Sequence, residues 1–457
     1  MLKYLTSRRF KVKRSISPAY LVLLWFGSFV LLGSVLLWLP FSHTPEQKVS
    51  FFDAAFTAVS ASCVTGLTVL NIADAFSFWG QLIIVLLLEM GGIGIMSFAY
   101  IGFDLIGKRA SMSYQAATAD ALFQNDSARE FKRVFRQILV ITLLIQAVGA
   151  ALLFLSLLPD YTDRLRELPW ALWSAIFHAV SAFCNGGFMA YHDGMEVIDG
   201  NVFFIVVLLV LITVGGLGHR VLVELRHLPK YIKQHEKKPH WVSLNTRVVL
   251  IMTGAVIFFG CIGFFIFGVS ETGGSSIRDE LFVVISGRTA GFTTVPMETI
   301  PLPSILILIT LMFIGGSPGS CAGGIKTTSL AIWLARIKAN LRNDSNVNIF
   351  GYTIAPDLVS RARILMALTM LWNLLGVFIL VVLHPHERLE TLIFEQVSAF
   401  GTVGLSMNFT PRLETLSRLW IMLSMFVGRL GPLSIALWMA PTVRSNIQRP
   451  IGRIMVG

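Results

Sequence analysis

Long apolar stretches alternate with polar connections along almost the whole chain. A helix needs about 20 mostly apolar residues to cross the hydrocarbon core of a membrane. Eight stretches reach or approach this length: residues 19–40, 78–101, 134–158, 202–223, 248–269, 302–314, 364–383 and 419–439. Only the stretch 302–314 is too short by itself. The pattern predicts an all-α integral membrane protein with eight transmembrane helices and no room for a sizeable soluble domain.

A shorter pattern recurs four times, each time between two of these stretches. Its copies have equal length and end in a glycine, at residues 56–66, 177–187, 281–291 and 394–404. A second glycine motif follows each copy about 25 residues later, at 91–94, 215–218, 315–318 and 428–431. Such repetition indicates one repeated structural unit: helix, pore helix, glycine-bearing loop, helix. The second motif fits close packing and a narrowed pathway equally well.

The segments that precede the loops, residues 51–62, 170–183, 279–287 and 389–400, are apolar but too short to cross a membrane. We expect each one to enter the membrane from outside and return. Ser50 with Asp53, and also Asp279, suit the starts of two such helices. Non-helical backbone at this depth must be buried in protein or line a watery cavity. Four loops can meet on one axis, which predicts a pseudo-fourfold arrangement around a single pore.

Basic residues concentrate before the first apolar stretch and in alternate connections. This bias explains the net charge of +11 as membrane orientation rather than nucleic-acid binding, and it predicts that both termini are cytoplasmic. The predicted order is an N-terminal segment (1–17), repeat 1 (18–107), a connection (108–133), repeat 2 (134–225), a connection (226–245), repeat 3 with a broken second helix (246–335), a connection (336–360), repeat 4 (361–440) and a C-terminal tail (441–457).

The composition agrees with a membrane location and with a protein that is not an enzyme. Charged residues make up 14% of the chain, against about 25% in soluble proteins. The first apolar stretch is too long for a signal peptide, so we expect it to be retained. The four cysteines, Cys63, Cys184, Cys261 and Cys321, have no metal-ligand spacing. The sequence contains no recognisable catalytic constellation and predicts no cofactor.

The four loops resemble ion-binding structures in their chemistry. Rings of backbone carbonyls replace the water shell of a monovalent cation, and glycine adopts the backbone angles that aim carbonyls inward. Isolated glycines more often serve helix packing, but recurrence at the ends of four short helices favours a selectivity filter. The predicted filter residues are Cys63, Val64, Thr65, Gly66, Asn185, Gly186, Gly187, Thr289, Ala290, Gly291, Thr402, Val403 and Gly404, with the ion at the four shared glycines.

The short stretch 302–314 runs into a segment rich in glycine and serine. Such a segment cannot continue a regular helix, and broken spans mark ion pathways in transporters. A phosphate-binding loop does not fit, because Ile325 separates Gly324 from Lys326 and no strand precedes the segment. The candidate gate residues are Gly315, Gly316, Ser317, Pro318, Gly319, Ser320, Gly323, Gly324 and Lys326.

Several charged residues fall inside or beside the predicted membrane segments. Glu89 either attracts cations or satisfies a neighbouring polar group, and Lys326 is a possible partner for it. Arg288 lies beside the third loop and is expected to point away from the ion, which it would repel. His178 and Glu395 are expected to be hydrogen-bonded structural groups. Arg429 is costly inside a span, so it is expected to face a cavity or a partner.

These loops and their repeat pattern resemble the membrane subunit of Ktr-type systems, within the Trk/Ktr/HKT superfamily of potassium transporters. The resemblance implies potassium uptake across the bacterial inner membrane, with potassium bound at the four glycines and Gly66 favouring potassium over sodium. It also implies that the segment after Ile314 is a gate loop contacted by Arg429. Relatives form homodimers on a cytosolic, nucleotide-binding regulatory ring (KtrA-like, RCK-type), and sodium-dependent symport is common among them.

Three alternatives stay open at this point. The same scaffold suits a sodium channel or a poorly selective cation channel, which a sodium and potassium competition assay would reveal. A membrane sensor that retains the fold without transport would show no flux. A secondary transporter with alternating access is less consistent with the sequence, because that class usually has two inverted repeats and these four units are parallel.

Overall fold

The computed structural model describes residues 18–93, 128–161, 167–191, 200–233, 242–269 and 276–431. Several expectations from the sequence lie outside these ranges. They concern the N-terminal segment 1–17, most of the connection 108–133, Gly94 of the first glycine motif, and the tail 441–457.

The described chain is almost entirely helical, and the order of a helix, a shorter helix and a further helix occurs four times. The first two units contain α1 (Pro18–Trp38), α2 (Phe51–Ser62) and α4 (Phe78–Ile93), then α7 (Ala128–Leu157), α8 (Leu168–Phe183), α9 (Val202–Leu217) and α10 (His219–Lys233). The other two contain α11 (Leu244–Phe267), α12 (Ile277–Ser286), α13 (Leu302–Phe313) and α14 (Thr327–Leu341), then α15 (Pro356–Leu383), α16 (Leu389–Gly401) and α17 (Thr415–Leu430).

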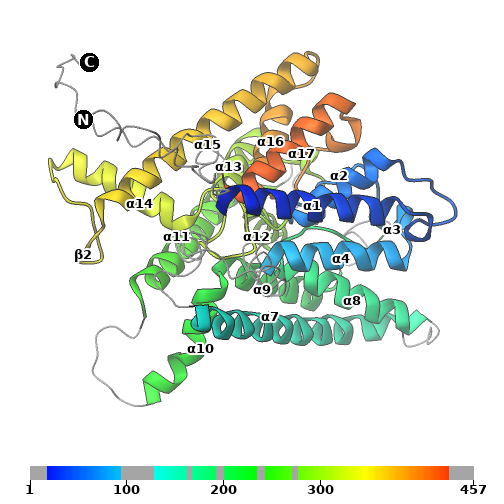
Figure 1. The fold of residues 1–457 in the computed structure, drawn as a ribbon, viewed down its shortest axis with the longest axis horizontal. Helices are drawn as coiled ribbons and strands as arrows, with labels where there is room; N and C mark the ends of the chain where they lie inside the picture. The colour runs from blue at the N-terminus through cyan, green and yellow to red at the C-terminus, as the bar shows by residue number, and fades with distance from the viewer. Residues whose placement is uncertain are drawn as a thin grey trace, which may run out of the picture.

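Minor elements connect these helices. They are α3 (Ile72–Ala75), the 3-10 turns Pro40–Ser42, Leu158–Tyr161, Met297–Thr299 and Thr410–Arg412, and a hairpin of β1 (Asn348–Ile349) and β2 (Tyr352–Thr353). The hairpin, α10 and α14 project from one end of the molecule, whereas α3 lies near the other (Figure 1).

The structure differs from the sequence-based expectation at two connections. The stretch 202–223 is not one straight helix, since α9 and α10 meet at Gly218 with a bend of 101°. Gly218 has a φ of 90°, which few other residues adopt. The predicted connection 336–360 contains the end of α14, the hairpin and the start of α15, because polar residues continue a helix beyond its apolar part.

Within the described residues, three helices are long and apolar enough to cross a membrane singly. They are Phe135–Leu157, Leu244–Phe267 and Pro356–Leu383, and the bent pair of Val202–Leu217 and His219–Arg226 makes a fourth if it counts as one span. Leu24–Trp38, Phe78–Ile93, Leu168–Phe183 and Leu302–Phe313 are shorter apolar helices.

Large apolar side chains face outward on these helices. Phe259 and Phe265 of α11 are 71% and 76% exposed, and Leu374 of α15 is 70% exposed. A soluble protein rarely exposes so many large apolar side chains to water, whereas lipid tails are as apolar as these side chains. The fold is therefore that of an all-α membrane protein.

Capping residues fix where two of the short helices begin. Ser50 precedes α2 and its hydroxyl accepts a hydrogen bond from the Asp53 amide at 3.1 Å. Ser276 precedes α12, whose first turn contains Asp279. Acidic groups there also complement the positive end of the helix dipole, so the start signals predicted for these two helices are confirmed.

Contacts between the four units follow one cyclic rule. The helix after each loop packs on the short helix of the following unit, as α4 does on α8, α9 on α12, and α13 on α16. The last unit returns to the first, since α17 packs on α2. The chain therefore closes on itself, and its four loops are brought to a common centre.

Candidate functional site

The four loops share one backbone conformation. The residue two places before each shared glycine has a left-handed φ: Val64 (56°), Asn185 (58°), Thr289 (79°) and Thr402 (49°). The glycines themselves also have positive φ: Gly66 (95°), Gly187 (65°), Gly291 (80°) and Gly404 (96°). A left-handed φ is sterically unfavourable for L-residues, and more so for the β-branched valine and threonine. The surrounding structure must therefore hold these loops in place.

The shared glycines form a closed ring. A Cβ added at Gly66 would lie 2.5 Å from the carbonyl oxygen of Gly186, and one at Gly187 would lie 2.7 Å from that of Ala290. The same relation joins Gly291 to the Val403 carbonyl and Gly404 to the Thr65 carbonyl. Each glycine thus abuts the carbonyl that precedes the next glycine around the ring, and any side chain there would overlap with it.

A serine of the short helix ties down three of the loops. Ser181 donates its hydroxyl to the Phe188 carbonyl at 2.9 Å, and Ser398 donates to the Leu405 carbonyl at 2.6 Å. Ser286 donates in the same way to the carbonyl of Phe292. These serines were not singled out from the sequence, although Ser181 and Ser398 occur in the repeated Val-Ser-Ala pattern that could have indicated them.

A cavity of about 590 Å³ opens above the ring. All four shared glycines line it, and so do nearby loop residues (Leu67, Phe188, Thr293 and Leu405), together with Asn71, Glu298 and Asn408. Asn71, the N-cap residue of α3, and Ile72, its first residue, belong to the lining. The glycine ring is therefore at the bottom of this cavity, which we call the vestibule.

The non-helical segment between α13 and α14, which we call the inner loop (residues 314–326), is fixed to the second unit. The Ser317 amide donates to the Gly216 carbonyl at 3.2 Å, and its hydroxyl bonds the Leu217 carbonyl. His219 bonds the Gly319 carbonyl through both its backbone amide, at 3.1 Å, and its ring Nδ1, at 2.8 Å. The bend between α9 and α10 thus provides the surface that receives the inner loop.

The inner loop lies directly beneath the ring. A Cβ on Gly323 would overlap with the Thr402 hydroxyl and would lie 2.7 Å from the Gly401 carbonyl. Arg429 of α17 donates to the carbonyl of Cys321 in the inner loop and to that of Gly91 on α4. Lys326 donates to the Ala322 carbonyl at 2.5 Å. Two cationic side chains and a backbone segment therefore stand below the glycine ring.

Glu89 does not pair with Lys326 in the part of the chain that the structure describes. Its Oε2 accepts a hydrogen bond from the Gln146 amide at 2.7 Å and one from the Cys184 thiol at 3.5 Å. Of the two roles open for Glu89, satisfying neighbouring polar groups is the one with contacts. Its other oxygen, Oε1, is buried and has no partner among the described residues.

The remaining polar residues near the loops have structural contacts. His178 Nδ1 bonds the Ser174 carbonyl at 2.7 Å, and its Nε2 accepts from the Ala190 amide at 3.4 Å. Glu395 accepts from Ser406 at 2.7 Å and also from Thr410, so it braces the vestibule wall. Both match the structural role expected of them. Arg288 is buried, and its Nε lacks a partner within the described residues.

The second glycine motif packs against the ends of the short helices. A Cβ at Gly91 would overlap with the Ser62 carbonyl, one at Gly215 with the Phe183 carbonyl, and one at Gly428 with the Phe400 carbonyl. Of the two roles left open for this motif, close packing is therefore the one that these three copies have.

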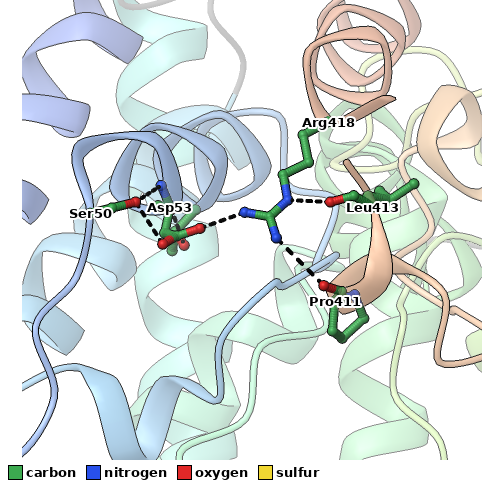
Figure 2. Close-up of polar contacts among 6 residues, drawn as sticks. Ser50, Asp53, Pro411, Leu413 and Arg418 are labelled. Atoms are coloured by element: carbon green, nitrogen blue, oxygen red, sulfur yellow. Dashed lines mark hydrogen bonds and ion pairs between the residues drawn. The ribbon is translucent and has the colours of Figure 1, made fainter. Parts of the chain in front are cut away.

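An ion pair joins the fourth unit to the first. Arg418 of α17 donates to Asp53 of α2 at 2.7 Å, and its Nε donates to the Leu413 carbonyl at 2.8 Å (Figure 2). Asp53 is itself held by Ser50, whose hydroxyl donates to it at 2.6 Å (Figure 2). The contact spans the boundary between the fourth unit and the first, and sequence analysis gave no signal for it.

Comparison with known proteins identifies the family. A family model described as a cation transport protein (TrkH) matches residues 25–446. The chain belongs to this family. A potassium/sodium uptake protein, NtpJ, of Enterococcus hirae is 33% identical to the chain and aligns with 99% of it and 100% of its own length. The Ktr system potassium uptake protein B of Bacillus subtilis is 32% identical over 96% of this chain and 97% of its own.

A solved structure shows the same fold. The potassium transporter TrkH from Vibrio parahaemolyticus aligns with a TM-score of 0.70, over 96% of this chain and 87% of its own, at 18% identity. The resemblance to Ktr-type proteins found in the sequence is thus confirmed, and so is the expectation of an ion transporter rather than an enzyme. The chain is a multi-pass membrane protein.

Proposed function

We propose that the chain is a potassium-uptake pathway in which the four shared glycines and the residues before them form the selectivity filter. The observation that carries the proposal is the closed glycine ring, in which four loops with the same backbone handedness abut one another beneath an open vestibule. Backbone carbonyls in such a ring replace the hydration shell of a monovalent cation. The names of the Enterococcus and Bacillus relatives support potassium as the ion.

The short helices add electrostatic support. α2, α8, α12 and α16 all end just before their loops, so their carbonyl ends point toward the ring. The carbonyl end of a helix carries a partial negative charge of about half an electron. Four such ends favour a cation at the centre and disfavour an anion.

The inner loop is the gate in this proposal. It lies across the pathway below the filter, and Arg429 holds it there by bonding its Cys321 carbonyl. Opening requires the loop to leave the ring, and its glycines allow such a rearrangement. The two cationic groups, on Lys326 and Arg429, repel a potassium ion that has passed the filter while the loop is in place.

The wider architecture belongs to the same proposal. Four tandem units with eight spans would surround one pore in the bacterial inner membrane, with both termini in the cytoplasm. The cyclic packing of α4, α9, α13 and α17 on the next short helix supports this arrangement. The Ktr name of the Bacillus relative supports a further component, which we propose to be a cytosolic regulatory ring acting on a homodimer of this chain.

Sodium permeation is a second candidate function. The Enterococcus relative is named for both potassium and sodium uptake, which favours a filter that admits both ions. The two candidates differ in competition, since a potassium-selective filter should ignore sodium at equal concentration.

Radiolabelled rubidium uptake into liposomes that hold the purified chain tests both candidates. We expect uptake that potassium blocks and sodium does not. Equal block by both ions would favour the poorly selective channel. Uptake no greater than in protein-free liposomes, repeated with the regulatory component added, would refute transport by this chain.

A further inference from the structure

Two of the four cysteines meet beneath the second loop. Cys184 is the C-cap residue of α8 and directly precedes Asn185, the first filter residue of that loop. Cys321 lies in the inner loop, at the residue whose carbonyl accepts from Arg429. Both are free thiols and both are buried. One cysteine thus belongs to the fixed scaffold of the filter and the other to the segment proposed to move.

The sulfur atoms of Cys184 and Cys321 both lie close to Gly92 of α4. A Cβ added at Gly92 of α4 would lie 2.7 Å from the Cys184 Sγ and 3.5 Å from the Cys321 Sγ. The two thiol groups are in side-chain contact with each other. A disulfide needs Cβ atoms about 3.5–4.5 Å apart, so only cysteines whose side chains lie side by side are candidates. The other cysteines, Cys63 and Cys261, have no such contact in the described structure.

Glu89 and Gln146 lie beside the pair. The Cys184 thiol donates to the Glu89 carboxylate at 3.5 Å, and the Gln146 amide lies 3.7 Å from the same sulfur. Glu89 is therefore in place to accept the proton that a thiol loses when it becomes a nucleophile. Its free oxygen, Oε1, leaves capacity for that proton.

We propose that Cys184 and Cys321 are a redox modification site that locks the inner loop in its closed position, an inference that rests on the proposed gate. A peroxide converts one thiol to a sulfenic acid and releases water. The second thiol attacks that sulfur, the S–S bond forms and a second water leaves. Two thiols lose two electrons and two protons, and one peroxide becomes two waters. A dithiol reverses the bond by thiol–disulfide exchange.

A disulfide between Cys184 and Cys321 would prevent the inner loop from moving. Hydrogen bonds from Arg429, Ser317 and His219 hold the inner loop, and each can break and reform on opening. A covalent bond to Cys184 cannot, so the loop would stay beneath the filter. Reducing conditions keep cytosolic thiols free, so the bond would form only under oxidative stress.

The test treats the full chain with hydrogen peroxide in liposomes and measures two quantities. Peptide mapping under non-reducing conditions detects a peptide pair linked through Cys184 and Cys321, and rubidium uptake reports the gate. Cys184→Ala and Cys321→Ala each remove one partner. Cys261→Ala is the matched control, because Cys261 lies on α11 away from the loops and leaves the pair intact.

After peroxide treatment, we expect the linked peptide in the parent chain and in Cys261→Ala. Uptake should fall to the level of protein-free liposomes in both and return with dithiothreitol. Each single variant of the pair should keep the uptake it had before peroxide. The proposal is wrong if no linked peptide forms, if it forms without loss of uptake, or if peroxide inhibits the pair variants as strongly as the parent. Uptake before oxidation tests the proposed function separately.

Discussion

At the residue scale, each shared glycine is required for two reasons, its backbone conformation and the lack of space for a side chain. Gly187 has a left-handed φ of 65°, and the space where its side chain would lie is next to the Ala290 carbonyl. Serine or alanine at such a position would strain the backbone and also push the neighbouring loop aside. One residue type therefore satisfies both the conformation of its own loop and the contact with the next loop.

Gly187→Ala should weaken potassium binding in the filter. Left-handed backbone costs a residue with a Cβ about 1–2 kcal/mol, which corresponds to roughly a tenfold loss of occupancy if the filter relaxes to escape it. The potassium concentration that halves rubidium uptake should therefore rise about tenfold. Gly254→Ala is the control, because the Cβ that it adds would lie in open space. An unchanged competition constant in Gly187→Ala would contradict the filter assignment.

The Arg429 side chain joins the inner loop, α4 and α17. Its guanidinium bonds the carbonyls of Cys321 and Gly91, so it links three of the four units. A buried charge is stabilised by such hydrogen bonds and is costly without them. The contact consists of hydrogen bonds, which can break and reform.

Arg429→Gln should increase the rate of rubidium uptake. The substitution removes the positive charge from the pathway and weakens the hold on the inner loop, so the closed state loses stability relative to the open one. The initial rate in liposomes measures the effect. Arg412→Gln is a control on the outer side, where Arg412 pairs with Glu387 at 2.9 Å. If rate and affinity were both unchanged in Arg429→Gln, its role in the gate would be excluded.

At the scale of elements, each short helix is held from two sides. α2 packs against α1 of its own unit and against α17 of the last unit, and the other short helices have equivalent neighbours. The boundary between α17 and α2 differs from the rest, because no loop of the chain connects those two units directly. Noncovalent contacts close the ring there, and the pair of Arg418 and Asp53 is one of them.

A double-mutant cycle of Asp53→Asn and Arg418→Gln should give a coupling free energy of about 0.5–1 kcal/mol in unfolding. The side chains are only 20% and 23% exposed, so the pair is screened less than a fully exposed one. The coupling free energy is measured by unfolding the purified chain in mixed micelles with an increasing fraction of anionic detergent.

The control for that cycle is the pair of Arg412 and Glu387, which lies within the fourth unit and whose arginine is 53% exposed. We expect a smaller coupling there because solvent screens the charges more. Equal couplings in the two cycles would mean that Arg418 and Asp53 contribute nothing special to ring closure.

At the scale of the whole molecule, the proposed filter exists only when all four units are assembled. Each glycine completes its contact with a carbonyl of a different unit, from Gly66 with Gly186 around to Gly404 with Thr65. An ion bound at the centre therefore contacts the whole ring and favours the folded chain over the unfolded one.

Potassium should accordingly raise the thermal stability of the purified chain. At a hundredfold excess over its dissociation constant, a ligand that binds only the folded state adds about 2.7 kcal/mol. The unfolding midpoint should rise with potassium chloride and should rise less with sodium chloride at equal ionic strength. Gly187→Ala should reduce the difference between the two salts. Identical midpoints in both salts would count against a potassium site in this ring.

Much of the architecture could be predicted from the sequence because hydrophobicity and glycine leave local signals. The apolar stretches, the short helices before the loops and the interrupted segment after Phe313 all have helices or helix ends near the expected places. The bend at Gly218 was not predicted, although the glycine motif 215–218 and the polar His219 and Arg220 mark its place. The roles of Ser181, Ser286 and Ser398 also required a structure, because their acceptors are backbone carbonyls.

By itself, the sequence determined the membrane-protein class, the repeated unit and the glycine positions, because burial in lipid and unusual backbone angles each constrain residue type locally. Only the tertiary structure decided which residues meet. Arg418 contacts Asp53, Arg429 contacts Gly91 and Cys184 contacts Cys321, although each pair is far apart in the chain. Such contacts depend on how four units close into a ring, and no local pattern of residues specifies that closure.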